Sequence, residues 1–318
     1  MGKSINGNNL QRIIGALKNG GEDAKMGILI HLLSPITQLI DSFILRKNTC
    51  DLENVKGIII SGPPRSGSTL IYQAITCALP CMPFTNLHAL FPRHASNIIR
   101  HINDDRQASR TQFKNYHGYT SSLYDVNEGN NIFSCVHKTD NIEYLNKKFC
   151  EIISKLNPSP NEILIFKNVL AYNVLDRIYR ATMDKQFVFI RVQRNPQAVI
   201  ESALKVYKET RNFQPIPESL RTSAIDDPVD FAYQQIKAIN ATLDDQFKSI
   251  PENAKYVIQY EDFCKFPFKH LEKLAYCYFN LPKGSIKKCR ALDSLQVSES
   301  VKVTKIEGEK IRDLLNIT

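Results

Sequence analysis

The chain has 318 residues, of which 43% are hydrophobic and 23% are charged, a composition typical of a soluble globular protein and far from that of a disordered chain. Its formal net charge of +9 favours an anionic ligand or partner. The charge alone does not separate nucleotide, nucleic acid, polysaccharide and membrane surface, and an ordinary solvated basic surface explains it equally well. No linker or internal repeat divides the sequence, so we expect one domain over residues 1–318.

Residues 1–56 are expected to form a helical extension. The start, MGKSINGNNL, is polar and lacks the basic-then-apolar order of a secretory signal, which predicts a cytoplasmic protein. The most apolar stretch, residues 26–45, contains residues that a membrane-spanning helix avoids: His31, Ser34, Pro35, Gln38 and Asp41. We therefore expect no transmembrane segment. We interpret the stretch as amphipathic helices that cap the core, with peripheral contact at a membrane surface as the alternative.

From residue 57 onwards, short apolar runs alternate with helical patterns. Strands are predicted over residues 57–61, 162–166, 187–192 and 256–260. Helices are predicted over residues 68–79, 141–156, 169–182, 196–208, 228–248 and 267–278. Apolar strands that alternate with helices predict a parallel sheet covered on both faces. The expected fold is therefore α/β, a P-loop-like three-layer sandwich with a central parallel sheet flanked by helices, followed by a tail over residues 283–318.

A candidate phosphate loop, GPPRSGST, spans residues 62–69 between the first predicted strand and its helix. At such a position, backbone N–H groups and a helix N-terminus can hold a phosphate. The spacing resembles G-x-x-x-x-G-K-[ST], but Ser68 stands where a nucleotide kinase has its lysine, and the basic residue is Arg65. A glycine-rich turn alone would equally be a structural turn. The strand–loop–helix context favours a phosphate site.

The residues that follow the neighbouring strands argue against a magnesium-dependent kinase. Such an enzyme needs a carboxylate at a strand end to hold the metal, whereas the predicted strands are followed by Lys167-Asn168 and by Arg194-Asn195. Side-chain cations in place of a metal fit sulfuryl transfer better, because a sulfuryl group carries less charge than a terminal phosphoryl group. An ATP-dependent phosphotransferase is therefore the second hypothesis, and a non-catalytic binder of nucleotide or anionic polymer is the third.

Several segments together resemble the sulfotransferases that use 3′-phosphoadenosine 5′-phosphosulfate (PAPS). PRSGSTL resembles their 5′-phosphosulfate loop. RNPQAVIES resembles their 3′-phosphate segment, in which Ser202 follows Arg194 by eight residues. YEDFCKFP resembles their late YED segment, and ILIFKN resembles a strand that ends in lysine in several branches. The resemblance covers a PAPS-binding core of residues 57–282 and is closer to bacterial and carbohydrate-type members than to the small cytosolic phenol and steroid enzymes.

This resemblance implies PAPS as the sulfuryl donor, adenosine 3′,5′-bisphosphate as the product, and no required metal. It implies donor binding by Arg65, Ser66, Gly67, Ser68, Thr69, Arg194 and Ser202, of which the last two would hold the 3′-phosphate. Arg65 would also stabilise charge on the bridging oxygen, and Lys167 would lie near the sulfuryl group at its strand end. Glu261 and Asp262 are predicted to be structural.

The catalytic base is the least determined part of the site. Transfer to a hydroxyl needs a His or a carboxylate within hydrogen-bond reach of the acceptor. In one branch of the family this is a Glu about twenty residues past the loop, where this chain has Asn86. His88 is our first candidate, followed by Glu128 and His137. Residues 85–160 are expected to bind the acceptor, a small molecule or carbohydrate rather than a nucleic acid, and the sequence predicts no oligomeric state.

Eight cysteines are spread along the chain without a CxxC pair. Cys77 and Cys81 are four residues apart, but no set of His and Cys completes a metal site around them. In a chain of this length we expect buried free thiols in a reducing compartment.

Overall fold

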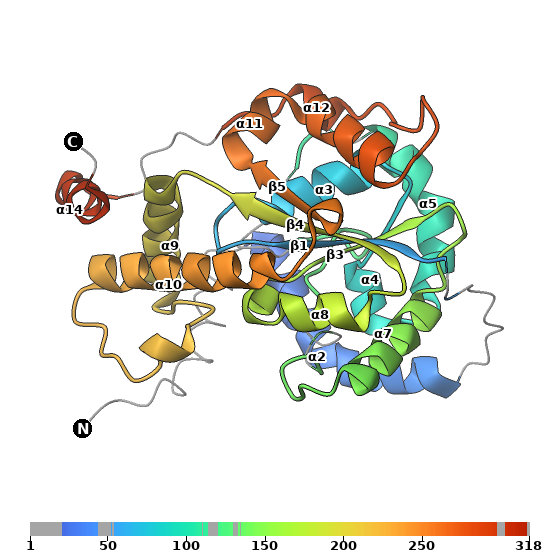
Figure 1. Cartoon of the computed structure of the whole chain (residues 1–318), viewed down its shortest axis with the longest axis horizontal. Helices are drawn as coiled ribbons and strands as arrows, with labels where there is room; N and C mark the ends of the chain where they lie inside the picture. Colours follow the sequence, from blue (N-terminus) through green and yellow to red (C-terminus); the bar gives the residue numbers. More distant parts are fainter. Residues whose placement is uncertain are drawn as a thin grey trace.

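A computed structural model describes residues 21–43, 52, 54–109, 111–113, 120–129, 133, 135–297 and 303–316. Its centre is a five-stranded sheet in the order β2-β3-β1-β4-β5, and every pairing is parallel. The strands are β1 (Lys56–Ser61), β2 (Cys81–Pro83), β3 (Ile163–Lys167), β4 (Gln186–Gln193) and β5 (Lys255–Gln259). Figure 1 shows the sheet between two layers of helices, which confirms the expected three-layer α/β fold.

Helices lie between and around these strands. They are α2 (Gly21–Phe43), α3 (Ser68–Ala78), α4 (Asn86–Leu90), α5 (Ala95–Ser109), α7 (Ile142–Leu156), α8 (Leu175–Ala181), α9 (Pro196–Thr210), α10 (Pro228–Lys248), α11 (Tyr260–Lys265), α12 (Pro267–Glu272), α13 (Arg290–Asp293) and α14 (Lys305–Leu315). Short 3₁₀ segments cover Val169–Asn173, Glu218–Leu220 and Glu252–Ala254, and a π-helical turn covers Lys273–Tyr278. The helices predicted from the sequence are present, and the 169–182 segment is divided into a 3₁₀ turn and α8.

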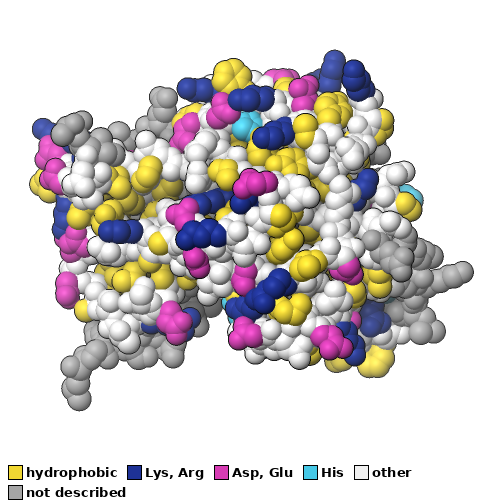
Figure 2. All heavy atoms as spheres, in the orientation of Figure 1, with side chains coloured by type: hydrophobic (Ala, Val, Ile, Leu, Met, Phe, Trp, Pro, Cys, Tyr) yellow, Lys and Arg dark blue, Asp and Glu magenta, His cyan; other side chains and the backbone are white. Residues whose placement is uncertain are grey.

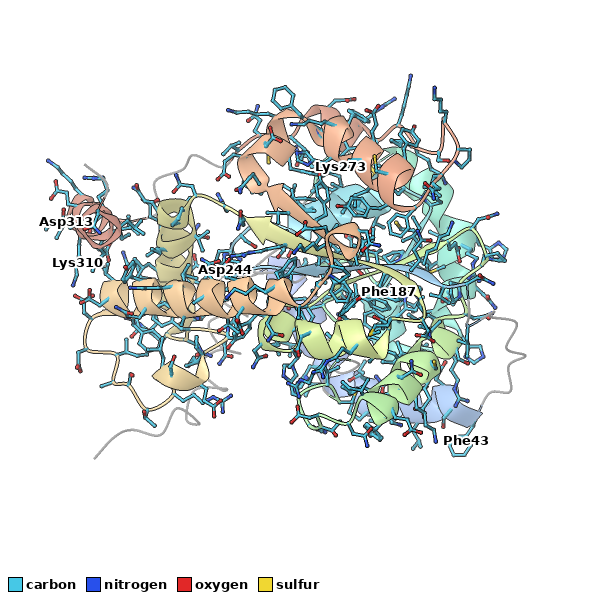
Figure 3. The ribbon with its side chains drawn as sticks, viewed as in Figure 1. Phe43, Phe187, Asp244, Lys273, Lys310 and Asp313 are labelled. Carbon is cyan, nitrogen blue, oxygen red and sulfur yellow. A yellow bond between two sulfur atoms is a disulfide. The ribbon has the colours of Figure 1, made fainter. Side chains whose placement is uncertain are left out.

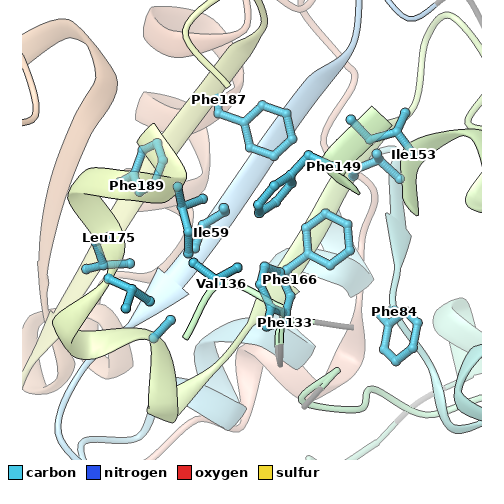
Figure 4. Close-up of a cluster of buried hydrophobic side chains, with 14 of the residues drawn as sticks. Ile59, Phe84, Phe133, Val136, Phe149, Ile153, Phe166, Leu175, Phe187 and Phe189 are labelled. Carbon is cyan, nitrogen blue, oxygen red and sulfur yellow. The ribbon is translucent and has the colours of Figure 1, made fainter. Parts of the chain in front are cut away.

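Both faces of the sheet are buried, because side chains of a strand alternate between them. Ile58 and Ile60 of β1 pack with α3 on one face. Ile59 points to the other face, in a cluster with residues of α7, α8 and α10. Figure 4 shows part of this second cluster, where Phe133 makes edge contacts with Phe149 and Phe166 at ring-centroid distances of 5.8 and 5.4 Å. Burial on both faces explains why the strands read as continuous apolar runs.

The expected tail over residues 283–318 contains two helices. Helix α14 packs on α9 and α10, where Ile311 is fully buried, and Lys310 pairs with Asp227 at 2.6 Å and Asp230 at 2.8 Å. The segment before α13 runs along the end of α3, where Cys289 forms a disulfide with Cys77. This bond corrects the expectation of free thiols for these two residues. Cys81, Cys150, Cys264 and Cys277 are free thiols, and Cys50 lies outside the described residues.

Residues 21–43 form one continuous helix, α2, with Pro35 inside it. The structure therefore has one helix where the sequence interpretation has several, and Ile30 places this helix against the core cluster. Among the described side chains of α2, only Ile30 and Asp41 are buried, and most of the large apolar ones face solvent. Lys25–Phe43 is also long and apolar enough to cross a membrane, judged by length and composition alone.

Candidate active site

The loop between β1 and α3 packs so closely on its neighbours that two positions accept only glycine. Gly67 has a positive φ of 89°, and a Cβ added there would lie 2.2 Å from the ring of Tyr260. A Cβ on Gly62 would lie 2.8 Å from both the Ser66 hydroxyl and the carbonyl oxygen of Val192. Glycine is used where backbone must approach another group this closely. The loop therefore presents its backbone at the carboxyl edge of the sheet.

The start of α3 has the properties of an anion site. Ser68 and Thr69 form its first turn, which contains no acidic residue. The first-turn N–H groups and the helix dipole favour negative charge at this end. The hydroxyl of Ser66 is buried and has no hydrogen-bond partner among the described residues, which costs about 1–3 kcal/mol for a buried polar group. A bound phosphate oxygen would remove that cost, so the residues present fit a nucleotide phosphate.

The residues predicted to bind the two ends of the donor lie next to one another. Arg65 Nε donates a hydrogen bond to the hydroxyl of Ser202 in α9 at 3.0 Å. Arg194, which follows β4, donates from Nη1 to the carbonyl oxygen of Arg65 at 3.1 Å. Arg65 itself has a φ of 69°, in the left-handed region that side-chain-bearing residues rarely adopt. Two cationic side chains thus converge at the loop through contacts that the sequence alone does not reveal.

Tyr260, the first residue of the YED segment, contacts both parts of this arrangement. The guanidinium of Arg194 lies over its ring, 4.4 Å from the centroid, in a cation–π contact. The same ring limits position 67 to glycine. Burial raises the pKa of Tyr260 to about 12, so its hydroxyl stays neutral. Sequence reasoning missed this residue, although an aromatic residue at a strand end before two acids was a usable signal.

The two acids that follow Tyr260 have structural contacts, in agreement with their predicted role. Glu261 accepts a hydrogen bond from the backbone N–H of Asn195 at 3.0 Å, and so fixes the segment that follows Arg194. Asp262 accepts from His270 Nε2 at 2.8 Å. These contacts tie the end of β5 to the end of β4 and to α12.

Lys167 is a buried cation with two partners at the edge of the sheet. It pairs in register with Ile60 and is 3% exposed. Its Nζ donates to the hydroxyl of Thr69 at 3.0 Å and forms an ion pair with Glu128. A buried charge needs such partners, because leaving it unpaired is strongly unfavourable. The Glu128 side chain is 20% exposed, so the carboxylate lies at the solvent-facing edge of this group.

His88, the first candidate base, is fully buried. The backbone N–H of Thr85 donates to His88 Nδ1 at 3.1 Å, and His88 Nε2 contacts the hydroxyl of Ser96 at 3.0 Å. The first of these contacts and the hydrogen bond from the backbone N–H of His88 to the hydroxyl of Thr85 at 3.3 Å form the capping box at the start of α4. The ring of His88 is therefore closed to solvent in this structure.

The third candidate base, His137, lies exposed in a turn beside Arg177 of α8. Desolvation of the ring by surrounding protein atoms, together with the positive charge of Arg177, lowers the pKa of His137 below the ordinary value. Of the three candidate bases, Glu128 is the one that contacts Lys167 and, through it, the phosphate loop.

Asn86, at the place where one branch of the family has its Glu, holds the loop that carries Glu128. Its side-chain amide donates to the carbonyl oxygens of Thr120 at 3.1 Å and Ser122 at 2.9 Å. Its side-chain oxygen accepts from the amide of Asn127 at 2.7 Å. Asn86 therefore fixes the position of Asn127, the residue that precedes Glu128.

A parallel sheet with a close-packed glycine loop at its carboxyl edge, beside Arg65, Lys167 and Arg194, is an arrangement typical of α/β proteins that bind phosphate groups. The sequence matches the model of the sulfotransferase family over residues 57–282, which is more than half of the chain. The chain belongs to the sulfotransferase family, and it is a sulfotransferase enzyme. None of the curated proteins matches the sequence significantly.

Solved bacterial sulfotransferases have a similar fold. Sulfotransferase STF1 of Mycobacterium tuberculosis H37Rv is 12% identical, with a TM-score of 0.55 over 95% of this chain and 89% of that one. STF9 of Mycobacterium avium is 11% identical (TM-score 0.46, 82% and 68% covered), and a sulfotransferase of Alicyclobacillus acidocaldarius is 11% identical (TM-score 0.42, 86% and 98% covered). At 12% identity and a TM-score of 0.55, the match to STF1 supports the fold alone.

Proposed function

We propose that this enzyme transfers the sulfuryl group of PAPS to a hydroxyl, or an amine, of a small-molecule or carbohydrate acceptor. The observation that carries the proposal is the convergence of Arg65, Arg194 and Ser202 beside the start of α3. A donor with phosphates at both the 5′ and the 3′ position needs two adjacent anion sites, and the contacts of Arg65 with Ser202 and Arg194 support such a pair of sites. PAPS, when bound, supplies an activated sulfuryl group on a 5′-phosphate leaving group.

The chain's own residues then have separate tasks. The loop backbone with Ser66, Gly67, Ser68 and Thr69 holds the 5′-phosphate, and Arg194 with Ser202 holds the 3′-phosphate. Arg65 contacts Ser202 and follows the loop prolines, so it links the two phosphate sites and stabilises charge on the bridging oxygen. Lys167, through Thr69, is placed to contact the transferred group.

We propose Glu128, in place of His88, as the general base. In an in-line displacement the acceptor oxygen forms a bond to sulfur as the bond from sulfur to the bridging oxygen breaks. The electron pair goes to the 5′-phosphate, and the acceptor proton goes to the Glu128 carboxylate. Partial exposure of Glu128 and its ion pair with Lys167 support this role, because a base must lie within hydrogen-bond reach of the acceptor.

We propose that the reaction needs no metal. The carboxyl ends of β3 and β4 present Lys167 and Arg194, where a magnesium-dependent phosphotransferase has a metal-binding carboxylate.

Charge on the surface is consistent with a small anionic ligand: Figure 2 shows basic and acidic side chains interspersed on the visible face rather than gathered in one basic surface suited to nucleic acid.

The cytoplasmic location stays a prediction that rests on the polar start of the chain. The Cys77–Cys289 bond argues against it, because disulfides persist mainly in oxidising compartments. Cell fractionation tests the location. Alkylation of free thiols before lysis tests whether Cys77 and Cys289 are bonded in the cell.

The test of the donor compares two ligands and two variants. Arg194→Ala should weaken binding of adenosine 3′,5′-bisphosphate about ten- to a hundredfold, since a charge-assisted contact contributes about 1.5–3 kcal/mol. Binding of adenosine 5′-phosphate, which lacks the 3′-phosphate, should change little. Arg221→Ala removes an exposed arginine and serves as the control. An equal loss for both ligands, or no loss for either, would remove Arg194 from the 3′-phosphate site.

A further inference from the structure

Helix α2 faces the protein with Ile30 and with polar side chains, whereas most of its large apolar side chains face solvent. Gln38 donates a hydrogen bond to the carbonyl oxygen of Ala89 in α4 at 2.8 Å. Asp41, which is 1% exposed, accepts from the backbone N–H of Arg93 at 2.9 Å and from His94 Nδ1 at 2.6 Å. A surface helix of a globular protein normally has the opposite orientation, with its apolar stripe toward the core.

The apolar face of α2 is a continuous stripe. Its side chains, exposed by 39–78%, are Leu29, Leu32, Leu33, Ile36, Leu39, Ile40 and Phe43. At about 100° per residue these positions fall within an arc of roughly 120°. Figure 3 shows Phe43 at the end of α2, pointing away from the body of the protein. Soluble monomers rarely expose so large a contiguous apolar surface, and such surfaces mark contacts with proteins or membranes.

We propose that the apolar face of α2 binds the surface of a lipid bilayer that contains anionic headgroups, with the helix lying in the plane of the interface. Lys25–Phe43 has the length and composition of a segment that is stable in hydrocarbon. Its inward contacts exclude a spanning orientation for this fold, because crossing would move Asp41 and Gln38 out of their hydrogen bonds and into the bilayer. The proposal is independent of the proposed donor and base.

Charge favours a lipid surface over a second copy of the chain. Lys25 is exposed at the start of the stripe, where it pairs with Glu22 at 2.8 Å, and Arg93 donates to the carbonyl oxygen of Ser42 at its end. Cations that flank an apolar stripe suit anionic headgroups, whereas two copies would each bring a net charge of +9. Six of the seven side chains in the stripe are Leu or Ile, and only Phe43 is of a type (Tyr, Trp, Phe, Met or Arg) in which protein interfaces are enriched.

Co-sedimentation of the full chain with vesicles tests the proposal. Vesicles of phosphatidylcholine with phosphatidylglycerol should bind the protein more strongly than vesicles of phosphatidylcholine alone. The double variant Ile36→Gln/Leu39→Gln should lower the partition coefficient about tenfold or more, since each side chain contributes apolar area. The control Met183→Gln/Ile306→Gln changes side chains that are 63% and 78% exposed elsewhere and should bind as the unmodified chain. Unfolding curves of both variants establish that they are folded.

Three results would overturn the proposal. The first is no binding of the full chain to either vesicle. The second is equal binding by the two double variants. The third is a dimer, detected by light scattering, that Ile36→Gln/Leu39→Gln dissolves without any vesicle binding, which would assign the stripe to a second copy.

Discussion

Among the described residues of the candidate site, Glu128 is the carboxylate that contacts a buried cation, Lys167, and is also partly exposed to solvent. We expect Glu128→Gln to lower kcat about 10²–10⁴-fold, the usual contribution of a positioned general base. Affinity for adenosine 3′,5′-bisphosphate should change little, because the base acts on the acceptor proton. Turnover and product titration on the same preparation measure both quantities.

His88→Ala is the matched comparison. It removes the ring that caps α4, so it should lower the melting temperature, with a loss of cap hydrogen bonds costing about 0.5–2 kcal/mol. Turnover per folded molecule should stay near that of the unmodified chain. If His88→Ala abolishes turnover in folded protein while Glu128→Gln retains it, the assignment of the base is reversed.

The residues of the phosphate loop could be predicted because they are contiguous in the sequence and their spacing carries the signal. The residues that contact the loop from distant parts of the chain could not be predicted in this way. Lys167 meets Glu128 across 39 residues and Thr69 across 98, and Tyr260 reaches Arg194 only because β4 and β5 are neighbours. Whether His88, Glu128 or His137 faces solvent depends on how deeply each side chain is buried. The spacing of residues along the sequence does not carry that information.

At the scale of elements, the strands with long apolar runs are predictable and the shortest one is not. β1, β3, β4 and β5 each have five to eight residues, whereas β2 has three and ends in Pro83, too few to show a period. Proline is tolerated there because β2 is an edge strand. Helix α2 was misjudged because its apolar residues suggested burial, while its polar residues make the contacts with α4.

The disulfide ties the end of α3 to the segment before α13. Reducing it, or Cys289→Ser, should lower the free energy of unfolding by about 2–5 kcal/mol, since the bond closes a long loop in the unfolded chain. Cys277→Ser changes an exposed free thiol and should leave stability unchanged. Alkylation without reduction should label Cys277 and leave Cys77 unlabelled. Full labelling of Cys77 would show that the bond does not form.

The segment from Tyr256 to His270 should give stability a pH dependence. His270 is buried between the hydroxyl of Tyr256 at 2.6 Å and Asp262 at 2.8 Å, and burial is the main reason why its pKa is lowered from 6.5. A lowered folded-state pKa means that its contribution is complete above pH 6.5 and is lost as the pH falls below that value.

Chemical denaturation between about pH 7 and pH 5 measures this contribution. The unmodified chain should lose stability over that range, and His270→Gln should lose less. His101→Gln, at an exposed position, should follow the unmodified chain. An identical slope for His270→Gln and the unmodified chain would mean that His270 is not the group that titrates.

At the scale of the whole molecule, the proposed function requires a nucleotide site that recognises a 3′-phosphate and does not depend on a metal. The most direct measurement is the melting temperature of the unmodified chain with adenosine 3′,5′-bisphosphate, adenosine 5′-phosphate, or ATP with Mg²⁺, each at the same concentration. At a hundredfold excess over its Kd a ligand adds about 2.7 kcal/mol to stability, which a melting scan resolves. We predict that adenosine 3′,5′-bisphosphate gives the largest increase and that Mg²⁺ does not change it. A larger increase with ATP and Mg²⁺ would contradict the assignment and favour a phosphotransferase.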